Sequence, residues 1–342
     1  MTIPSRVLMI YPKFVPNSFW NYTEACELVG AKYPTAPLGL ITVAAMLPKH
    51  WDIRLVNRNT ESLTDADLDW ADLVMVGGML NQQPDAIYLI DLAHQHGKPV
   101  CVGGPDVSSS PHLYAEADFQ VIGEAEQIIE DFIAAWESGE RKGVFIAEKF
   151  KIDVTLSPMP RYDLINFDHY LFIGVQYSRG CPFTCEFCDI IELYGRVPRT
   201  KTNDQILAEL QALYDQDGTA FQVEELAGGF QLLTRPIYHR WLVRLRRTGQ
   251  DLRLTSPARE TLAIIAYRQP IMRADVEAIR GVHCGEVLRL LMEKGLVRIA
   301  GRHDSLGRPV LYGTTKKFLQ MLGLKSLKDL PQVEQLKPPP GR

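Results

Sequence analysis

The chain lacks the features that carry a protein into or across a membrane. None of its apolar stretches reaches about 18 uncharged residues, so we expect no membrane-spanning helix. The N-terminus has neither the apolar core nor the cleavage site of a signal peptide, and we expect a cytoplasmic protein. Only six cysteines occur in 342 residues, which argues against a disulfide framework in a chain without a secretion signal.

An even distribution of charge is also missing, because acidic and basic residues are concentrated in different halves. Residues 1–217 carry 16 Lys and Arg against 30 Asp and Glu, a net charge of −14. Residues 218–342 carry 21 against 11, a net charge of +10. This asymmetry indicates halves with different partners or different origins, and the length predicts two or more domains.

The first 150 residues alternate between short apolar runs and helical patterns. Continuous apolar strands separated by helices are typical of a parallel sheet covered on both faces, so we predict a doubly wound α/β domain. The predicted strands are residues 6–11, 52–57, 73–77, 99–103 and 119–122, and the predicted helices are residues 38–47, 84–96 and 125–136.

Glycine follows three of these predicted strands. Ligands of open α/β sheets bind beyond the carboxyl ends of the strands, where glycine lets the backbone approach a ligand closely. The candidate cofactor-binding residues are therefore Gly77, Gly78, Gly103, Gly104, Gly123 and Glu124. The alternative is that these residues form only tight turns between strand and helix. No G-x-G-x-x-G pattern follows the first strand, so a dinucleotide is not favoured.

Three cysteines, Cys181, Cys185 and Cys188, follow a strand predicted at residues 171–178. Thiolates at this spacing can hold three irons of a [4Fe–4S] cluster and leave the fourth iron open to S-adenosylmethionine. The alternatives are a structural zinc site or three unrelated thiols, but zinc needs a fourth ligand and no other His or Cys lies close in sequence. We interpret the remaining cysteines as small buried hydrophobic residues: Cys26, Cys101 and Cys284.

The cysteine spacing, with Phe187 before the last thiol, resembles the radical S-adenosylmethionine superfamily. Residues 1–217 resemble its cobalamin-binding members, in the subgroup that includes hopanoid methylases. Besides the strand-end glycines, the matching stretches are residues 37–40, 123–126 and 178–183. The resemblance implies a cobalamin-binding N-terminal domain, a [4Fe–4S] cluster and bound S-adenosylmethionine. The Asp-x-His-x-x-Gly motif that supplies an axial histidine in methionine synthase-like domains is absent.

The resemblance to a radical enzyme ends near residue 217. A complete (β/α)8 barrel takes about 250 residues, whereas only the strand at 171–178 and a helix at 203–214 are predicted around the motif. A radical site must be kept from solvent, and one strand with one helix does not enclose it. We therefore predict a truncated barrel, leave enzymatic activity open and assign no catalytic residue.

Beyond Gly218 the pattern changes to a hairpin, at residues 221–226 and 230–234, followed by three helices and a second hairpin. This order predicts a winged helix. The helices are residues 257–267, 273–280 and 285–294, and the strands of the second hairpin are residues 297–300 and 309–312. The last of these helices carries acidic as well as basic residues, so direct DNA binding is not expected.

Residues 221–331 resemble segregation and condensation protein B of bacteria. The matching stretches are residues 223–232, 260–270, 273–281, 307–315 and 323–327. The resemblance implies two winged helices, dimerisation and binding to the kleisin subunit of the bacterial condensin complex. Only the terminal hairpin of the first winged helix is recognisable here, so dimerisation through that domain is not expected.

The sequence thus predicts a fusion of two truncated proteins. Its parts are a cobalamin-binding-like α/β domain (1–140), a connection (141–170), the start of a radical S-adenosylmethionine barrel (171–217), a hairpin and linker (218–250), a winged-helix domain (251–331) and a disordered tail (332–342). The alternatives are an active cobalamin-dependent methylase and a condensin accessory protein with an inert N-terminal half.

Overall fold

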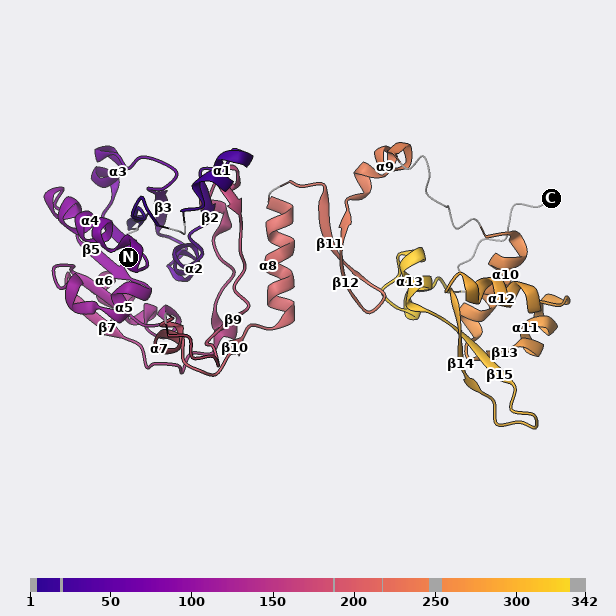
Figure 1. Ribbon diagram of the computed structural model, residues 1–342. Helices are drawn as coiled ribbons and strands as arrows, with labels where there is room; N and C mark the ends of the chain where they lie inside the picture. The colour runs from indigo at the N-terminus through magenta and orange to yellow at the C-terminus, as the bar shows by residue number, and fades with distance from the viewer. Residues whose placement is uncertain (1–4, 19–20, 187, 217, 246–253, 333–342) are drawn as a thin grey trace. The chain divides into compact units, whose positions relative to one another are not determined.

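The computed structural model describes residues 5–18, 21–186, 188–216, 218–245 and 254–332. The chain divides into two compact units, Met1–Asp217 and Gly218–Arg342 (Figure 1). Phe187 and residues 333–342 of the tail lie outside the described residues. No helix within the described ranges is long and apolar enough to cross a membrane.

The first unit is built on a six-stranded parallel sheet, which confirms the predicted α/β class. Its strands in spatial order are β3 (Asp52–Asn57), β1 (Arg6–Tyr11), β4 (Leu73–Gly77), β5 (Val100–Gly103), β6 (Phe119–Ile122) and β7 (Gly143–Ile146). Successive side chains of β1 alternate between two cores, Val7 and Met9 in one and Leu8 and Ile10 in the other. Burial on both faces explains why the inner strands are continuous apolar runs.

Helices cover both faces of this sheet (Figure 1). They are α2 (Leu38–Met46) and α6 (Ile129–Ser138) on one face, and α3 (Asp65–Trp70), α4 (Gln83–Gln95) and α5 (Pro105–Ser109) on the other. A short helix, α1 (Thr23–Val29), precedes β2 (Tyr33–Thr35). Because the strands of the main sheet are all parallel, their carboxyl ends lie along one edge, where α/β folds bind ligands.

The strand predicted at residues 171–178 is wrong in extent. The strand β8 (Tyr170–Phe172) pairs in parallel with β2, and the chain is not extended in a sheet again until Ser178. The ladder stops because β2 is only three residues long and because Gly174 weakens a strand interior. Strand β7 also differs from expectation, since it lies in the segment predicted as a connection and adds an edge strand to the main sheet.

A two-stranded antiparallel ribbon frames the cysteine loop. Its strands are β9 (Ser178–Arg179) and β10 (Arg199–Thr200), and the short helix α7 (Ile190–Tyr194) lies between them in the chain. Helix α8 (Asn203–Gln216) follows the ribbon, at the position predicted from the sequence. The ribbon ties together the two stems of the loop that carries Cys181, Cys185 and Cys188.

The second unit contains a separate hydrophobic core. Its elements are the hairpin β11 (Phe221–Leu226) and β12 (Gly229–Thr234), the helices α9 (His239–Leu245), α10 (Ser256–Arg268), α11 (Arg273–Arg280), α12 (Gly285–Glu293) and α13 (Lys316–Leu322), and a sheet of β13 (Ile271–Met272), β15 (Val310–Thr314) and β14 (Val297–Arg302). Ile265, Leu288 and Leu291 lie at the centre of this core. Helices α10 to α12 precede the β14–β15 pair, which is the order expected from the sequence.

The turn of the β11–β12 hairpin is tied to the segment after α13. Ala227 and Gly228 have φ values of 54° and 73°, the left-handed pair that a tight hairpin turn requires. Their N–H groups donate to the carbonyls of Leu324 and Lys325, each at 3.0 Å. Lys325 also forms an ion pair with Glu225 at 3.1 Å. These contacts make the hairpin part of the second unit.

Candidate functional site

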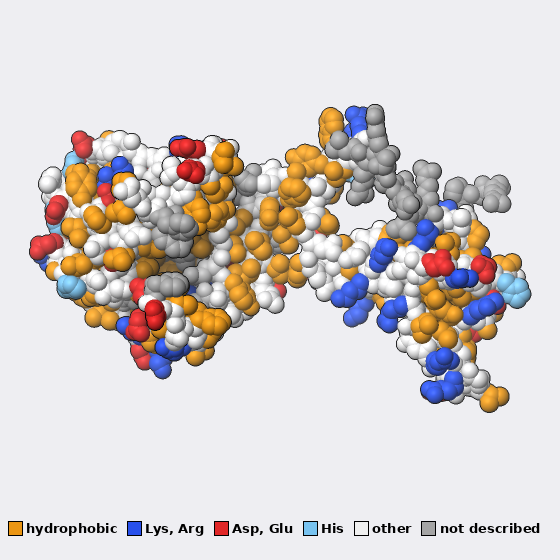
Figure 2. Space-filling model, in the orientation of Figure 1, with side chains coloured by type: hydrophobic (Ala, Val, Ile, Leu, Met, Phe, Trp, Pro, Cys, Tyr) orange, Lys and Arg blue, Asp and Glu red, His pale blue; other side chains and the backbone are white. Residues whose placement is uncertain are grey.

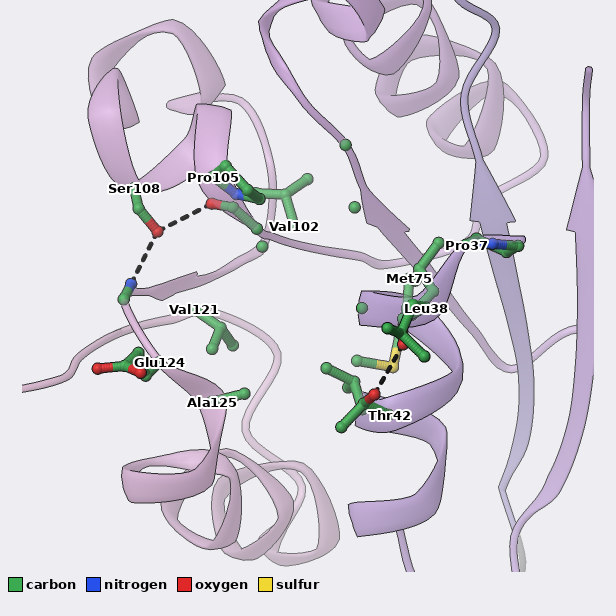
Figure 3. A pocket seen from close by; sticks show the side chains of 18 of the residues that line it. Pro37, Leu38, Thr42, Met75, Val102, Pro105, Ser108, Val121, Glu124 and Ala125 are labelled. Carbon is green, nitrogen blue, oxygen red and sulfur yellow. Dashed lines mark hydrogen bonds between the residues drawn. The ribbon is translucent and has the colours of Figure 1, made fainter. Parts of the chain in front are cut away.

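A cavity of about 320 Å³ lies at the carboxyl ends of β4, β5 and β6. Figure 3 shows Val102 and Val121 on one side of it and Leu38, Thr42 and Met75 on the other. Its volume is at the lower end of the ~300–1,000 Å³ usual for small-molecule sites. All six candidate cofactor-binding residues line it: Gly77, Gly78, Gly103, Gly104, Gly123 and Glu124.

The strand-end glycines have different physical reasons for lacking a side chain. Gly104 and Gly123 have φ values of +99° and +97°, and a Cβ at Gly123 would stand 2.9 Å from the Cβ of Ala147. The backbone therefore requires glycine at these two positions. Gly77 has no such conformation, and a Cβ there would meet ordinary contacts at 3.5 Å. The backbone at position 77 therefore does not require glycine.

The hydroxyl groups in the wall of the cavity hold the backbone in place. Ser108 Oγ donates to the Gly104 carbonyl and accepts from the Gly123 N–H, both at 2.8 Å (Figure 3). Thr42 Oγ1 donates to the Leu38 carbonyl at 2.7 Å. No histidine is found among the described residues that line the cavity, so its wall offers a metal centre no imidazole ligand.

Residues between 176 and 194, far from the strand-end glycines in the sequence, complete the wall of the cavity. Gln176 and Arg179 precede the cysteine loop and line the cavity, as do Leu193 and Tyr194 of α7. Burial raises the pKa of the Tyr194 phenol, so it is neutral at physiological pH. The cavity is therefore bounded both by the sheet and by the two stems of the cysteine loop.

A buried cluster of four charges joins these stems to the end of β6. Arg179 contacts Glu124 at 3.1 Å and Glu126 at 2.6 Å, and Arg199 contacts Glu124 at 2.8 Å. Burial acts to raise the pKa of Glu126, but the hydrogen bond and charge of Arg179 outweigh it and hold that pKa below its ordinary value. Burial acts to lower the pKa of Arg179, whereas Glu126 and Glu124 raise it above the ordinary value. Glu124, predicted to bind a cofactor, has both carboxylate oxygens bonded to arginines.

The three motif cysteines lie on an exposed loop. Cys185 is exposed, and Cys181 and Cys188 are partly exposed. Backbone hydrogen bonds shape the loop, from Cys181 N–H to the Gly195 carbonyl at 3.0 Å and from Cys188 N–H to the Cys185 carbonyl at 3.2 Å. Across the described part of the chain, no group of three or more His, Cys, Asp or Glu side chains could hold a metal ion. The three thiols therefore do not surround a single metal-ion position.

Sequence reasoning did not find Glu126, Arg179 and Arg199 as site residues. Arg179 and Arg199 contact Glu124 across 55 and 75 residues of the chain, so no local sequence pattern could indicate these contacts. A signal was nevertheless present, because residues 123–126 and 178–183 were two of the stretches that carried the family resemblance. The structure places these two stretches against each other.

Two family models match the chain in different regions. The B12 binding domain matches residues 28–133, which include all five candidate glycines and Glu124. The segregation and condensation complex subunit ScpB matches residues 186–333, from within the cysteine motif to the end of the described chain.

Two proteins named as methyltransferases or methylases resemble the N-terminal part. An uncharacterised methyltransferase of Synechocystis sp. is 50% identical over 212 residues, 61% of this chain and 39% of that protein. The hopanoid C-2 methylase of Rhodopseudomonas palustris is 35% identical over 282 residues, 80% of this chain and 52% of that protein, an alignment that runs past residue 217. The chain thus spans about half or less of the length of these two relatives.

A third relative resembles the C-terminal part. Segregation and condensation protein B of Moorella thermoacetica is 47% identical over 133 residues, 39% of this chain and 68% of that protein. The similarity therefore covers most of a protein of that family. Through its C-terminal part the chain belongs to the family of segregation and condensation complex subunit ScpB, and it joins that part to a B12-binding, methylase-like N-terminal part.

Proposed function

We propose that the first unit binds cobalamin in the cavity at the carboxyl ends of β4, β5 and β6. The main support is the position of the cavity, whose strand-end residues lie inside the region that matches the B12 binding domain. Parallel α/β sheets bind cofactors at this edge because free backbone groups at the strand ends can form hydrogen bonds there.

The residues of the cavity suit a corrinoid held without a histidine ligand. The apolar side chains of Met75, Val102 and Val121 line the cavity and offer the ring a dry surface. Bound cobalamin supplies a cobalt centre that can carry a methyl group, in keeping with the names of the two methyltransferase relatives. The chain's own contribution is to bind the ring and exclude water from it.

Cobalamin binding can be tested with a pair of matched glycine substitutions. Gly39 lines the cavity and a Cβ there meets no neighbour within 4 Å, so Gly39→Trp is chosen to add bulk at the cavity wall. Gly174 also has open space but lies outside the cavity, so Gly174→Trp is the control. Equilibrium dialysis of the full chain with hydroxocobalamin should show saturable binding that only Gly39→Trp removes. Absence of saturable binding at micromolar concentrations would refute the proposal.

We also propose that the second unit binds the kleisin subunit of the condensin complex. The ScpB family match supports a partner in that complex. Helices α10 to α12 and the β14–β15 hairpin support a winged helix. Arg289 of α12 forms an ion pair with Glu293 at 3.1 Å, which reduces the charge available to phosphate and favours a protein partner over DNA.

Two matched core substitutions assign kleisin binding to a unit. Leu288→Asp buries a charge in the core of the second unit, and Leu89→Asp does the same in the first, because both side chains are buried. In a pull-down of the full chain by immobilised kleisin, Leu288→Asp should abolish capture and Leu89→Asp should not. Capture that survives Leu288→Asp, or no capture of the unsubstituted chain at micromolar concentrations, would contradict the proposal.

Iron–sulfur binding is a separate proposal, supported by the spacing of Cys181, Cys185 and Cys188 alone. Anaerobic reconstitution of the full chain should then give about four irons per chain. Cys185→Ser should lower the iron content, whereas Cys26→Ser, at a buried thiol outside the motif, should not. Production of 5′-deoxyadenosine from S-adenosylmethionine would favour an active enzyme, and its absence despite bound iron would exclude one.

A further inference from the structure

We propose that Glu124 is a positioning residue that fastens the β9–β10 ribbon, at the base of the cysteine loop, against the cavity. The ribbon's strands lead into and out of that loop. Glu124 follows β6, so it links a strand end of the main sheet to the ribbon. The inference goes beyond cobalamin binding, because it concerns the wall of the cavity and holds for any occupant.

The ribbon places two positive charges directly opposite each other, since Arg179 and Arg199 are register partners. Like charges at opposite positions of a ladder destabilise it. The two side chains are only 10% and 16% exposed, so water screens their repulsion weakly. Closure of the ribbon against the sheet therefore requires buried counter-charges.

Glu124 is the carboxylate that reaches both strands of the ribbon. Its Oε1 accepts from Arg179 at 3.1 Å and its Oε2 from Arg199 at 2.8 Å. Glu126 contacts Arg179 at 2.6 Å, so it balances one of the two charges. Loss of the Glu124 charge would leave two buried guanidinium groups facing one carboxylate, which strongly favours movement of the ribbon into water.

Arg199 also holds a part of the wall of the cavity. Arg199 donates to the Tyr194 carbonyl at 3.0 Å and to the Ile152 carbonyl at 2.9 Å. Tyr194 and Leu193 line the cavity beside Arg179. Release of the ribbon should therefore open the cavity and expose the strand residues of its floor, which include Cys101.

The rate of Cys101 alkylation measures this opening. Cys101 is 2% exposed, and Cys26 and Cys284, which lie outside the cavity, are 3% and 1% exposed. All three thiols have pKa values raised by burial, so they react only when exposed. The full chain is treated with N-ethylmaleimide, and each cysteine is followed by peptide mass spectrometry.

Glu124→Gln should raise the Cys101 rate by about tenfold or more, the equivalent of about 1.4 kcal/mol of lost closure. Cys26 and Cys284 should keep their rates. The same substitution at the exposed Glu116 should change none of the three. An unchanged Cys101 rate in Glu124→Gln would overturn the proposal. So would a parallel rise at Cys26, because that would show general loosening of the first unit.

A double variant tests whether the charge balance is the cause. Glu124→Gln combined with Arg199→Gln again leaves one guanidinium facing one carboxylate. Because the two positions share one interaction, their effects should not add, and the rise in the Cys101 rate should be smaller than the product of the rises in Glu124→Gln and Arg199→Gln measured separately. A rise equal to or above that product would contradict the proposal.

Discussion

Hydrophobic cores enclose the six-stranded sheet of the first unit and the helices α10 to α12 of the second, but not the β11–β12 hairpin. In the first unit, helices bury both faces of the six-stranded sheet. In the second unit, α10 to α12 and the three-stranded sheet enclose their own apolar core. The β11–β12 hairpin of the second unit, in contrast, leaves Phe221, Phe230 and Leu232 between 45% and 50% exposed.

The contrast shows which parts of the chain enclose a hydrophobic core of their own and which part, the hairpin, does not. A two-stranded hairpin is only marginally stable alone, and the β11–β12 hairpin depends on its contacts with Leu324 and Lys325. The space-filling view shows apolar side chains gathered on the surface over this hairpin (Figure 2). We therefore expect the binding sites in the parts with complete cores, and we expect substitutions there to cost more stability than substitutions in the hairpin.

The largest effect is expected from Phe132→Ala in the first unit. Phe132 is fully buried and packs edge-on against Phe119, with ring centroids 5.4 Å apart. Truncation should lower the free energy of unfolding of this unit by about 3–5 kcal/mol. Urea unfolding followed by hydrogen exchange of residues 6–146 measures it, and a loss below about 1 kcal/mol would show that this core is not closely packed.

Leu288→Ala makes the matching test in the second unit. Leu288 is 3% exposed and lies in the core between α10 and α12. A loss of about 2–5 kcal/mol is expected for this unit. Leu306→Ala, at a fully exposed leucine of the β14–β15 turn, is the control and should change little. Equal losses of unfolding free energy in the two variants would show that Leu288 does not lie in a closely packed core.

Acid should weaken the second unit through Glu277. The Cys284 N–H and Arg273 hold the pKa of Glu277 at about 2, below its ordinary value of 4.5. Because the folded-state pKa is the lower one, this contribution is present above pH 4.5 and is lost as the pH falls towards about 2. Glu277→Gln should flatten the acid-unfolding curve in that window, whereas Glu286→Gln, at an exposed position, should not.

The smallest effect is expected from Phe230→Ser in the exposed hairpin. Phe230 is 48% exposed, so the free energy of unfolding should change by less than about 0.5 kcal/mol. Thermal unfolding of the full chain measures it beside Leu288→Ala. A loss of more than about 2 kcal/mol would show that the hairpin has a buried face after all.

The sequence predicted most of the first sheet because buried parallel strands are continuous apolar runs. Strand β7 was not predicted because it is a short edge strand with alternating burial, directly after Arg141 and Lys142. The β9–β10 ribbon was not predicted because strands of two residues have no periodic pattern. Glu124 was found as a strand-end residue, but its bonds to Arg179 and Arg199 depend on long-range folding that local patterns do not encode.

Hydrogen exchange of the full chain with and without hydroxocobalamin tests the central claim most directly. If the first unit holds the corrinoid at its strand ends, exchange should slow in residues 77–82, 103–109 and 123–129, which line or follow the cavity. Residues 256–322 should exchange at the same rate with and without the ligand. Protection confined to residues 256–322, or none at the strand ends under saturating ligand, would contradict the account.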